Sequence, residues 1–368
     1  MTTTSLAGLE TPALLVDGAR MDRNVAEMAG LMRSAGVALR PHFKTSKCVE
    51  VARHQLAAGA AGLTCSTPAE VALLQDEGVG DLLWAHQPVG PAKVAFAVTA
   101  LRRGGLTLAL DSAEAAAPLA EAAAGAGVAV PYLLEVDTGL GRAGVDPDQA
   151  VETAAALAAL GPLQLRGVLT HEGHLAGLGG DRAAVEAAGA RAGKDLAEVA
   201  AGLRTAGHDC VIVSVGSTPG ATSAPFADGV TEARPGTYVY YDANQVALGG
   251  AEPGRCALTV LTRVVSAQRA GTVIVDAGIK AMSSDASLGA GGLGTACDAA
   301  GVPLDGVTFA AGNEEHGYLT GPGTARLRVG DPLRVIPNHA CGAVNMWSAV
   351  HVVDGDRVID RWPIHARH

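Results

Sequence analysis

The chain has 368 residues and a formal net charge of −10, and 48% of its residues are hydrophobic. This length allows one large domain with a smaller one beside it. The acidic balance, the aromatic content of only 3% and the lack of a basic stripe argue against nucleic acid as a partner.

No apolar run approaches the ~20 residues of a membrane span, which argues against a membrane partner. The N-terminus has neither the basic nor the apolar region of a signal peptide. Six cysteines are scattered without C-x-x-C or framework spacing, the pattern of reduced thiols with one or two potential metal ligands among them. We therefore expect a cytoplasmic protein.

The first two-thirds of the chain alternates strand-like and helix-like segments. Eight apolar runs are predicted strands: Ala13–Asp17, Ala38–His42, Gly62–Ser66, Leu82–His86, Leu106–Leu110, Pro131–Val136, Leu165–Thr170 and Val211–Val215. Helical patterns lie between them, for example at Arg20–Ser34, Pro68–Glu77, Glu114–Ala124 and Arg182–Ala206. Eight strands, each followed by a helix, predict an α/β fold with a closed parallel (β/α)8 TIM barrel over residues 1–248. A doubly wound open sheet is the alternative.

The pattern changes after Asp242. Four predicted strands follow without long helices between them: Cys256–Ala267, Thr272–Ile279, Leu333–His339 and Ala349–Pro363. The last of these contains Asp354-Gly355-Asp356, a good hairpin turn. We expect a mainly antiparallel β domain over residues 249–368, joined to the barrel near Ala243–Arg255.

Lys44 stands in the segment Arg40–Lys47, which follows a short apolar run and precedes a helical pattern. That places it at the C-terminal end of a predicted strand, where α/β proteins keep their chemistry. A lysine held in a partly dry pocket has a lowered pKa, and its amine can attack carbonyls. The alternative is a basic surface turn, but polar residues also follow the other predicted strands on the same rim.

A loop of small and hydroxylated residues, Gly216-Ser217-Thr218, follows the last predicted barrel strand. Small residues let the backbone approach an anion, and the two hydroxyls add donors. Loops at this place in barrels often hold a phosphate. Together with a rim lysine the loop suggests pyridoxal 5'-phosphate (PLP), with Lys44 for the aldehyde.

Arg142 lies in Gly139-Leu140-Gly141-Arg142-Ala143-Gly144, which follows another predicted strand. The glycine spacing resembles a dinucleotide fingerprint, but it lacks the first-strand position and the acidic residue ~20 residues further on. Arg142 either steadies the cofactor or pairs with Asp137 as a structural arginine.

His339 and Cys341 stand two residues apart at the end of a predicted strand, so their side chains share a face. Nitrogen and sulfur ligands suit zinc, and a site with only two protein ligands would be open to substrate. The alternative is a buried histidine beside a free cysteine.

Several motifs occur in a characteristic order: His171-Glu172-Gly173-His174, Ser214–Pro219, Arg234–Tyr238, Asp276–Lys280, Glu315-His316-Gly317 and Pro337–Cys341. With Arg40-Pro41-His42-Phe43-Lys44, they resemble the D-serine dehydratase / D-threonine aldolase family of fold-type III, alanine-racemase-like PLP enzymes. The resemblance begins at Thr11-Pro12-Ala13 and covers nearly the whole chain.

The resemblance implies that Lys44 carries the cofactor and also moves the substrate's Cα proton. It implies that Gly216, Ser217 and Thr218 bind the phosphate and that Tyr238 lies near the pyridine nitrogen. It further implies a homodimer in which the partner's C-terminal domain closes the site.

The resemblance also implies that His339 and Cys341 bind a divalent metal, which is zinc in the dehydratases. Members that cleave D-threonine have an aspartate in place of Cys341, and that carboxylate suits Mn²⁺ or Mg²⁺. They also carry a basic histidine where this sequence has Gly177. His171, counted among the cofactor-binding residues, takes a place often held by tyrosine in the aldolases.

These features favour β-elimination from a D-β-hydroxy amino acid, giving a 2-oxo acid and ammonia. The alternatives are a D-threonine or 3-hydroxy-D-aspartate aldolase, a metal-independent amino-acid racemase, and a non-catalytic PLP carrier. Such carriers lack a C-terminal β domain, whereas this chain continues well past the barrel. The rival for the cofactor lysine is Lys280, which follows a predicted strand of the second domain.

Overall fold

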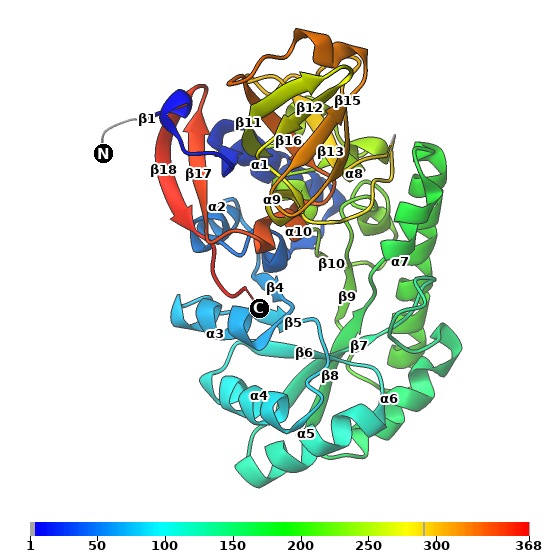
Figure 1. Cartoon of the computed structure of the whole chain (residues 1–368). Coiled ribbons are helices and arrows are strands. Elements are labelled where there is room, and N and C mark those ends of the chain that lie inside the picture. Colours follow the sequence, from blue (N-terminus) through cyan, green and yellow to red (C-terminus); the bar gives the residue numbers. More distant parts are fainter. Residues whose placement is uncertain (1–3, 290, 368) are drawn as a thin grey trace.

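A computed structural model describes residues 4–289 and 291–367 and folds them into a barrel and a second sheet, shown at the bottom and top of Figure 1. The barrel sheet has eight parallel strands in the order β3-β10-β9-β8-β7-β6-β5-β4. Its strands are β3 (Ala38–Leu39), β4 (Leu63–Cys65), β5 (Leu82–Trp84), β6 (Leu106–Leu110), β7 (Val130–Glu135), β8 (Leu163–Leu169), β9 (Ile212–Val215) and β10 (Glu232–Ala233).

The two ends of this sheet meet. The chain that continues β3 contacts β4, where the N–H of Thr64 donates to the carbonyl of Pro41 at 2.8 Å. His42 and Thr64 also form an isolated parallel bridge. The sheet therefore curls round on itself, and the predicted TIM-barrel fold class is confirmed.

Two of the helices show clear capping at both ends. In α1, the Asp17 carboxylate accepts the N–H of Arg20, and Gly36 ends the helix with a φ of 72°. Ser112 and Gly127 play the same two parts in α5. The helices are α1 (Gly18–Ala35), α2 (Val49–Ala57), α3 (Pro68–Asp76), α4 (Pro91–Arg103), α5 (Ala113–Ala126), α6 (Ala150–Ala158), α7 (Arg182–Thr205), α8 (Ala243–Ala247), α9 (Ile279–Met282) and α10 (Ala340–Asn345).

The prediction that Ala13–Asp17 opens the barrel is wrong. This strand, β2, belongs to the second sheet, where it pairs antiparallel with β11 (Leu258–Arg269) and parallel with β17 (Ala349–Asp354). The barrel reaches eight strands through β10, a two-residue strand that the apolar pattern does not mark. A buried apolar run fits either sheet, so the sequence pattern alone does not assign it to one.

The second sheet is mainly antiparallel, as predicted, and four predicted strands recur in β11, β12, β16 and the β17–β18 hairpin. A long path runs β1-β18-β17-β2-β11-β12-β15-β14, while β16 pairs with β11 and β13. The remaining strands are β1 (Thr4–Ser5), β12 (Thr272–Val275), β13 (Gly294–Cys297), β14 (Thr308–Gly312), β15 (Gly317–Thr320), β16 (Pro332–Pro337) and β18 (Arg357–Pro363).

Each sheet has a hydrophobic core of its own. The barrel core contains Trp84, Tyr132 and Phe43, and the second core contains Phe309 and Tyr240, all with at most 1% exposure. The two cores also share elements, since Val25 of α1 and Val51 of α2 belong to the second core and Ile336 of β16 to the barrel core. Within the described ranges, none of the helices is long and apolar enough to cross a membrane.

Candidate active site

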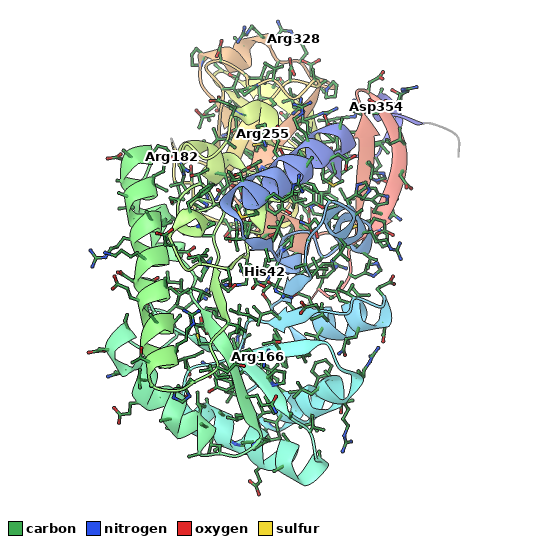
Figure 2. The ribbon with its side chains drawn as sticks, turned by 180° about the vertical axis from the view of Figure 1, so that it is seen from behind. His42, Arg166, Arg182, Arg255, Arg328 and Asp354 are labelled. Atoms are coloured by element: carbon green, nitrogen blue, oxygen red, sulfur yellow. The ribbon has the colours of Figure 1, made fainter. Side chains whose placement is uncertain are left out.

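A cavity of about 620 Å³ lies where the C-terminal ends of the barrel strands face the second domain. Figure 2 shows His42, one of its lining residues, between the two parts of the molecule. Eight of the nine predicted site residues line this cavity: Lys44, Arg142, His171, Gly216, Ser217, Thr218, His339 and Cys341. Lys44 and Cys341, which are 297 positions apart in the sequence, thus share one cavity.

Lys44 sits in the 3-10 turn η2 (Phe43–Thr45), which follows β3. Its neighbours Phe43 and Thr45 are fully buried and anchor the turn, while Lys44 itself lines the cavity. In the described part of the chain, the Lys44 ammonium has no hydrogen-bonding or ion-pair partner. Lys280 by contrast is exposed and pairs with Glu315 at 2.9 Å, and it does not line the cavity. The geometry therefore favours Lys44 as the reactive amine.

A side chain at Gly216 would crowd Arg234. A Cβ there would lie 2.9 Å from Nη2 of Arg234. Its N–H donates to Oε1 of Glu172 at 3.0 Å, and its carbonyl accepts from Nδ1 of His171. The loop is thus fixed by neighbours from two other segments, and Ser217 and Thr218 are presented at the cavity wall.

His171 is held in one tautomer. Because the carbonyl of Gly216 can only accept, Nδ1 carries the proton. Burial, followed by the nearby positive charge of Lys44, lowers the pKa of His171 to about 3. The ring is therefore neutral at physiological pH, and its Nε2 lone pair is free to accept a hydrogen bond.

Arg234 is a lining residue that the sequence analysis did not single out. It follows β10, is 5% exposed, and donates to the carbonyl of Thr170 at 2.6 Å and to Oγ of Ser214 at 2.6 Å. Burial lowers its pKa, but a guanidinium remains charged. Its place in the Arg234–Tyr238 motif is the sequence feature that could have identified it.

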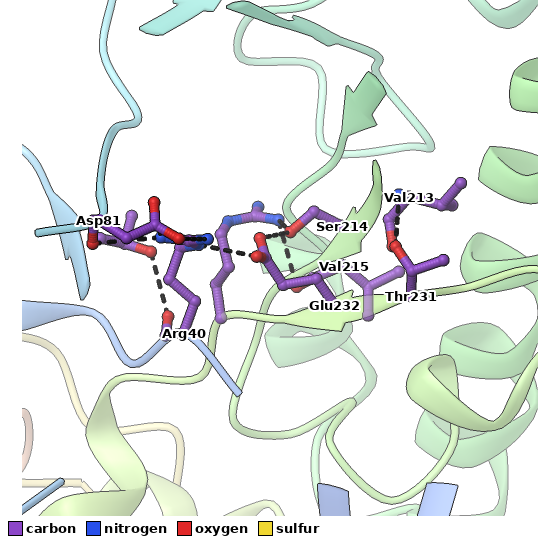
Figure 3. Close-up of polar contacts among 9 residues, drawn as sticks. Arg40, Asp81, Val213, Ser214, Val215, Thr231 and Glu232 are labelled. Atoms are coloured by element: carbon purple, nitrogen blue, oxygen red, sulfur yellow. Dashed lines mark hydrogen bonds and ion pairs between the residues drawn. The ribbon is translucent and has the colours of Figure 1, made fainter. Parts of the chain in front are cut away.

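A buried polar chain holds Ser214 and so supports Arg234. Figure 3 shows Glu232 between Ser214, whose Oγ donates to it at 2.6 Å, and Arg40, whose Nε donates at 2.7 Å. Arg40 in turn makes a two-pronged contact with Asp81, at 2.8 and 2.9 Å. Such a network fixes side chains because each buried polar atom has a partner. Arg40 therefore supports Arg234, a lining residue of the cavity, through Glu232 and Ser214.

Arg142 does not pair with Asp137, which was the structural alternative for it. Its Nη2 lies 3.6 Å from Oε1 of Glu135, and the Arg142 side chain is 55% exposed. The Asp137 carboxylate instead accepts three backbone N–H groups, those of residues 139–141. Burial raises the pKa of Glu135, and also that of Glu172, so two acids missed by sequence reasoning line the same cavity.

Tyr238 is the predicted site residue that does not line the cavity in the described chain. Its side chain is fully buried, and its hydroxyl accepts from Nε2 of Gln55 at 3.0 Å. Its contact with the Gly216–Thr218 loop is through the backbone, because its N–H donates to Oγ1 of Thr218 at 3.2 Å.

His339 and Cys341 stand at the start of α10, directly after β16. The thiolate of Cys341 raises the pKa of His339 above its ordinary value. Burial alone would raise the pKa of Cys341, but the imidazolium of His339 lowers it below its usual range. Thr45, next to Lys44, places its Oγ1 3.2 Å from Sγ of Cys341. The two predicted metal ligands thus adjoin the lysine turn.

The residues of the cavity fit the two groups that the resemblance implies. For PLP there is a lysine amine that has no partner among the described residues, next to two hydroxyls and to a glycine at which a Cβ would crowd Arg234. For a metal there is an imidazole beside a thiolate, a donor set that suits zinc. No cluster of three or more metal-ligating side chains occurs among the described residues, so a metal here would keep open positions.

A parallel barrel with a free lysine after its first strand, capped by a mainly antiparallel domain, defines the alanine-racemase-like class of enzymes. The family described as "Alanine racemase, N-terminal domain" matches residues 16–244, and that described as "Putative serine dehydratase domain" matches residues 257–353. The chain belongs to the D-serine dehydratase / D-threonine aldolase family of alanine-racemase-like, PLP-dependent lyases. The resemblance found in the sequence is confirmed.

Known relatives span nearly the whole chain. It is 38% identical to a D-threo-3-hydroxyaspartate dehydratase from Delftia sp., over 97% of this chain and 98% of that one. It is 32% identical to a D-threonine aldolase from Arthrobacter sp. (98% and 94%), and 28% identical to a D-serine dehydratase from Dictyostelium discoideum (95% of each).

Solved structures agree with these relatives. The Delftia dehydratase superposes with a TM-score of 0.91 at 37% identity, covering 98% of both chains. A D-threonine aldolase from Filomicrobium marinum gives a TM-score of 0.88 at 29% identity, over 98% of this chain and 96% of that one. The chain is therefore similar over its full described length both to dehydratases and to aldolases.

Proposed function

We propose that this protein is a PLP- and zinc-dependent dehydratase of D-β-hydroxy amino acids. The substrate loses its Cα proton and β-hydroxyl as water, and hydrolysis of the dehydrated product then gives a 2-oxo acid and ammonia. The observation that carries the proposal is the His339–Cys341 pair, which opens onto the same cavity as Lys44.

On the cofactor side, PLP supplies an electron sink that makes the Cα proton of a bound amino acid acidic. Lys44 holds the cofactor and moves that proton at its Nζ. The loop of Gly216, Ser217 and Thr218 offers backbone and hydroxyl donors to the phosphate. His171 contributes a neutral Nε2 acceptor, and its Nδ1 bond to Gly216 keeps the ring in place.

On the metal side, zinc supplies Lewis-acid assistance to a poor leaving group such as hydroxide. His339 and Cys341 hold it, and Asp242 accepts from Nδ1 of His339 at 3.1 Å, which orients the ring. A relative supports the presence of a metal, because a D-threo-3-hydroxyaspartate dehydratase with one cysteine replaced by alanine was solved "in the metal-free form".

Two features favour elimination over cleavage of the Cα–Cβ bond. Cys341 presents a soft thiolate where the resemblance implies a carboxylate in the aldolases. Gly177 lies exposed in the turn η4 (Gly173–Leu178) and brings no side chain to the place of the aldolase base. The identity to the dehydratase, 38%, also exceeds the 32% to the aldolase.

A product assay tests the reaction. The protein, loaded with PLP and zinc, is given a panel that includes D-serine, D-threonine and both diastereomers of 3-hydroxy-D-aspartate. We expect a 2-oxo acid and ammonia in equal amounts, with loss of turnover on chelation. Glycine and an aldehyde as main products would identify an aldolase, and metal-independent interconversion of D- and L-forms would identify a racemase.

We also propose a cytoplasmic homodimer. The six cysteines are free thiols, which suits a reducing compartment. A partner's C-terminal domain over the barrel rim would shield the Lys44 amine and the cavity around it from water. Light scattering at assay dilution should give twice the chain mass of 36.8 kDa, and a fully active monomer would refute the shared site.

A further inference from the structure

The segment after β18 returns from the second domain to the barrel. In Figure 1 this red segment runs down from β18 towards β4 and α3. Ile364 is 7% exposed and packs in the second core, and its N–H donates to the carbonyl of Ser348 at 2.9 Å. Beyond it, His365 and Ala366 form hydrogen bonds with Lys47, a residue of the barrel domain.

Lys47 receives this segment at both its backbone and its side chain. The N–H of His365 donates to the Lys47 carbonyl at 2.7 Å, and Nζ of Lys47 donates to the Ala366 carbonyl at 2.8 Å. The same Nζ pairs with Oε1 of Glu70 at 2.7 Å, in a contact that is almost wholly buried. Oε2 of Glu70 accepts the N–H of Ser66, which lines the cavity, at 2.6 Å.

Lys47 also closes the turn that presents Lys44. The carbonyl of Phe43 accepts the N–H of Ser46 at 3.1 Å and that of Lys47 at 2.9 Å, so Lys44 lies inside a hydrogen-bonded loop. Lys47 has a φ of 47°, a left-handed conformation that is uncommon for a lysine. Such a conformation persists only where the surroundings over-determine it. Two of the contacts that do so come from His365 and Ala366.

We propose that His365–Ala366 is a latch that positions the Lys44 turn, with Lys47 as the positioning residue through which it acts. The latch ties the second domain to the end of the turn that follows β3, near the point where Thr45 meets Cys341. Releasing it lets Lys47 relax, and the turn then presents the Lys44 amine in more than one orientation. The consequence for PLP rests on the proposed function.

A matched pair of variants removes a single donor. Proline has no N–H, so His365→Pro loses the bond to the Lys47 carbonyl, whereas His365→Ala keeps the backbone donor. A second pair shortens the chain. Stopping after Ile364 removes the latch, and stopping after Ala366 keeps the oxygen that Nζ of Lys47 contacts.

The first measurement does not involve PLP. We expect the amides of Ser46 and Lys47 to exchange hydrogen about tenfold faster or more in the His365→Pro chain and in the chain ending at Ile364. The two control chains should match the parent. Unchanged exchange in both latch-free chains would overturn the proposal, whether or not the protein binds PLP.

The second measurement is the PLP dissociation constant, taken well below the unfolding midpoint. We expect it to rise about fivefold or more in both latch-free chains and to stay within about twofold of the parent in the controls. A lower midpoint with an unchanged dissociation constant would reduce the segment to a structural support. A parent chain that binds no PLP at all would contradict the proposed function. The hydrogen-exchange result would still decide whether the latch exists.

Discussion

Nδ1 of His339 lies 3.1 Å from Oδ2 of Asp242, a carboxylate with no solvent exposure. The same Oδ2 accepts the N–H of Ala340 at 2.9 Å, and Oδ1 accepts that of Gln245 at 2.9 Å. Because the carboxylate can only accept, Nδ1 of His339 carries a proton. Nε2 is then the ring atom left for a metal, and Asp242 determines that choice.

Asp242→Asn should weaken metal binding by about 10–100-fold, the usual effect of losing an outer partner of a ligand histidine. An amide that accepts from Gln245 turns its NH₂ towards Nδ1 of His339, so the ring is driven to the other tautomer. The measurement is a competition titration of the PLP-loaded protein against a chromophoric chelator.

Asp298→Asn is the matched control, because the Asp298 carboxylate likewise accepts backbone N–H groups, from Ala300 and Val302, in the second domain. It should leave metal affinity unchanged. An Asp242→Asn protein with parental metal affinity would show that Asp242 only caps α8.

Lys44→Ala should abolish covalent attachment of PLP. Borohydride reduction followed by peptide mapping should label Lys44 in the parent protein and no lysine in the variant. Lys280→Ala, which removes an exposed ion pair with Glu315, should bind PLP like the parent. A label on Lys280 would contradict the arrangement of the whole rim.

Metal removal should separate cofactor binding from catalysis. Exhaustive chelation should abolish turnover while the absorption of bound PLP persists. In the described chain, Lys44 and the Gly216–Thr218 loop donate no hydrogen bond to the His339 ring or to the Cys341 sulfur, so they do not depend on the metal. Cys341→Asp should weaken zinc use and favour Mn²⁺, since a carboxylate is the harder ligand. Undiminished turnover after chelation would show that a metal at His339 and Cys341 has no role in catalysis.

Tyr238→Phe should lower stability without affecting the cofactor. The variant leaves Nε2 of Gln55 without its buried acceptor, at a cost of about 1–3 kcal/mol in the free energy of unfolding. The PLP dissociation constant should stay within about twofold of the parent, because the hydroxyl points into the core. A large loss of PLP affinity at unchanged stability would instead support the placement near the pyridine nitrogen that the resemblance implies.

The barrel could be predicted because its central strands, such as Leu82–Trp84, are continuous apolar runs with helices between them. The assignment of Ala13–Asp17 to the wrong sheet shows the limit of that pattern, since a buried strand has the same composition in either sheet. Lys44 and the His339–Cys341 pair could be named because each stands at a strand end. Their meeting across two domains was implied only by the resemblance.

The buried polar residues could not be predicted in the same way. Glu172, Arg234 and Asp242 are charged residues with at most 5% exposure, and the local pattern of apolar and polar residues does not mark them as buried. Their burial depends on partners far along the chain, such as Gly216 for Glu172 and His339 for Asp242.

Acid should lower the free energy of unfolding of this protein, and His171 should contribute to that loss. Its pKa is about 3 in the folded chain, because of burial and then the charge of Lys44, against an ordinary value of about 6.5. Between pH 6.5 and 3 the unfolded chain therefore binds a proton at this residue that the folded chain does not. Stability is fully present above pH 6.5 and falls with pH by up to about 1.4 kcal/mol per unit for one such group. His42, whose pKa is also lowered by burial and by Lys44, adds a second.

His171→Asn should remove one of these two contributions, because the amide NH₂ can still donate to the carbonyl of Gly216 but does not titrate. Urea unfolding of the PLP-free protein between pH 4.5 and 7 should give a slope of stability against pH that is shallower by up to one proton than in the parent. His316→Gln, at an exposed position, should keep the parental slope. An unchanged slope in His171→Asn would mean that His171 accepts a proton in the folded protein, and its place as a neutral acceptor in the cavity would then be wrong.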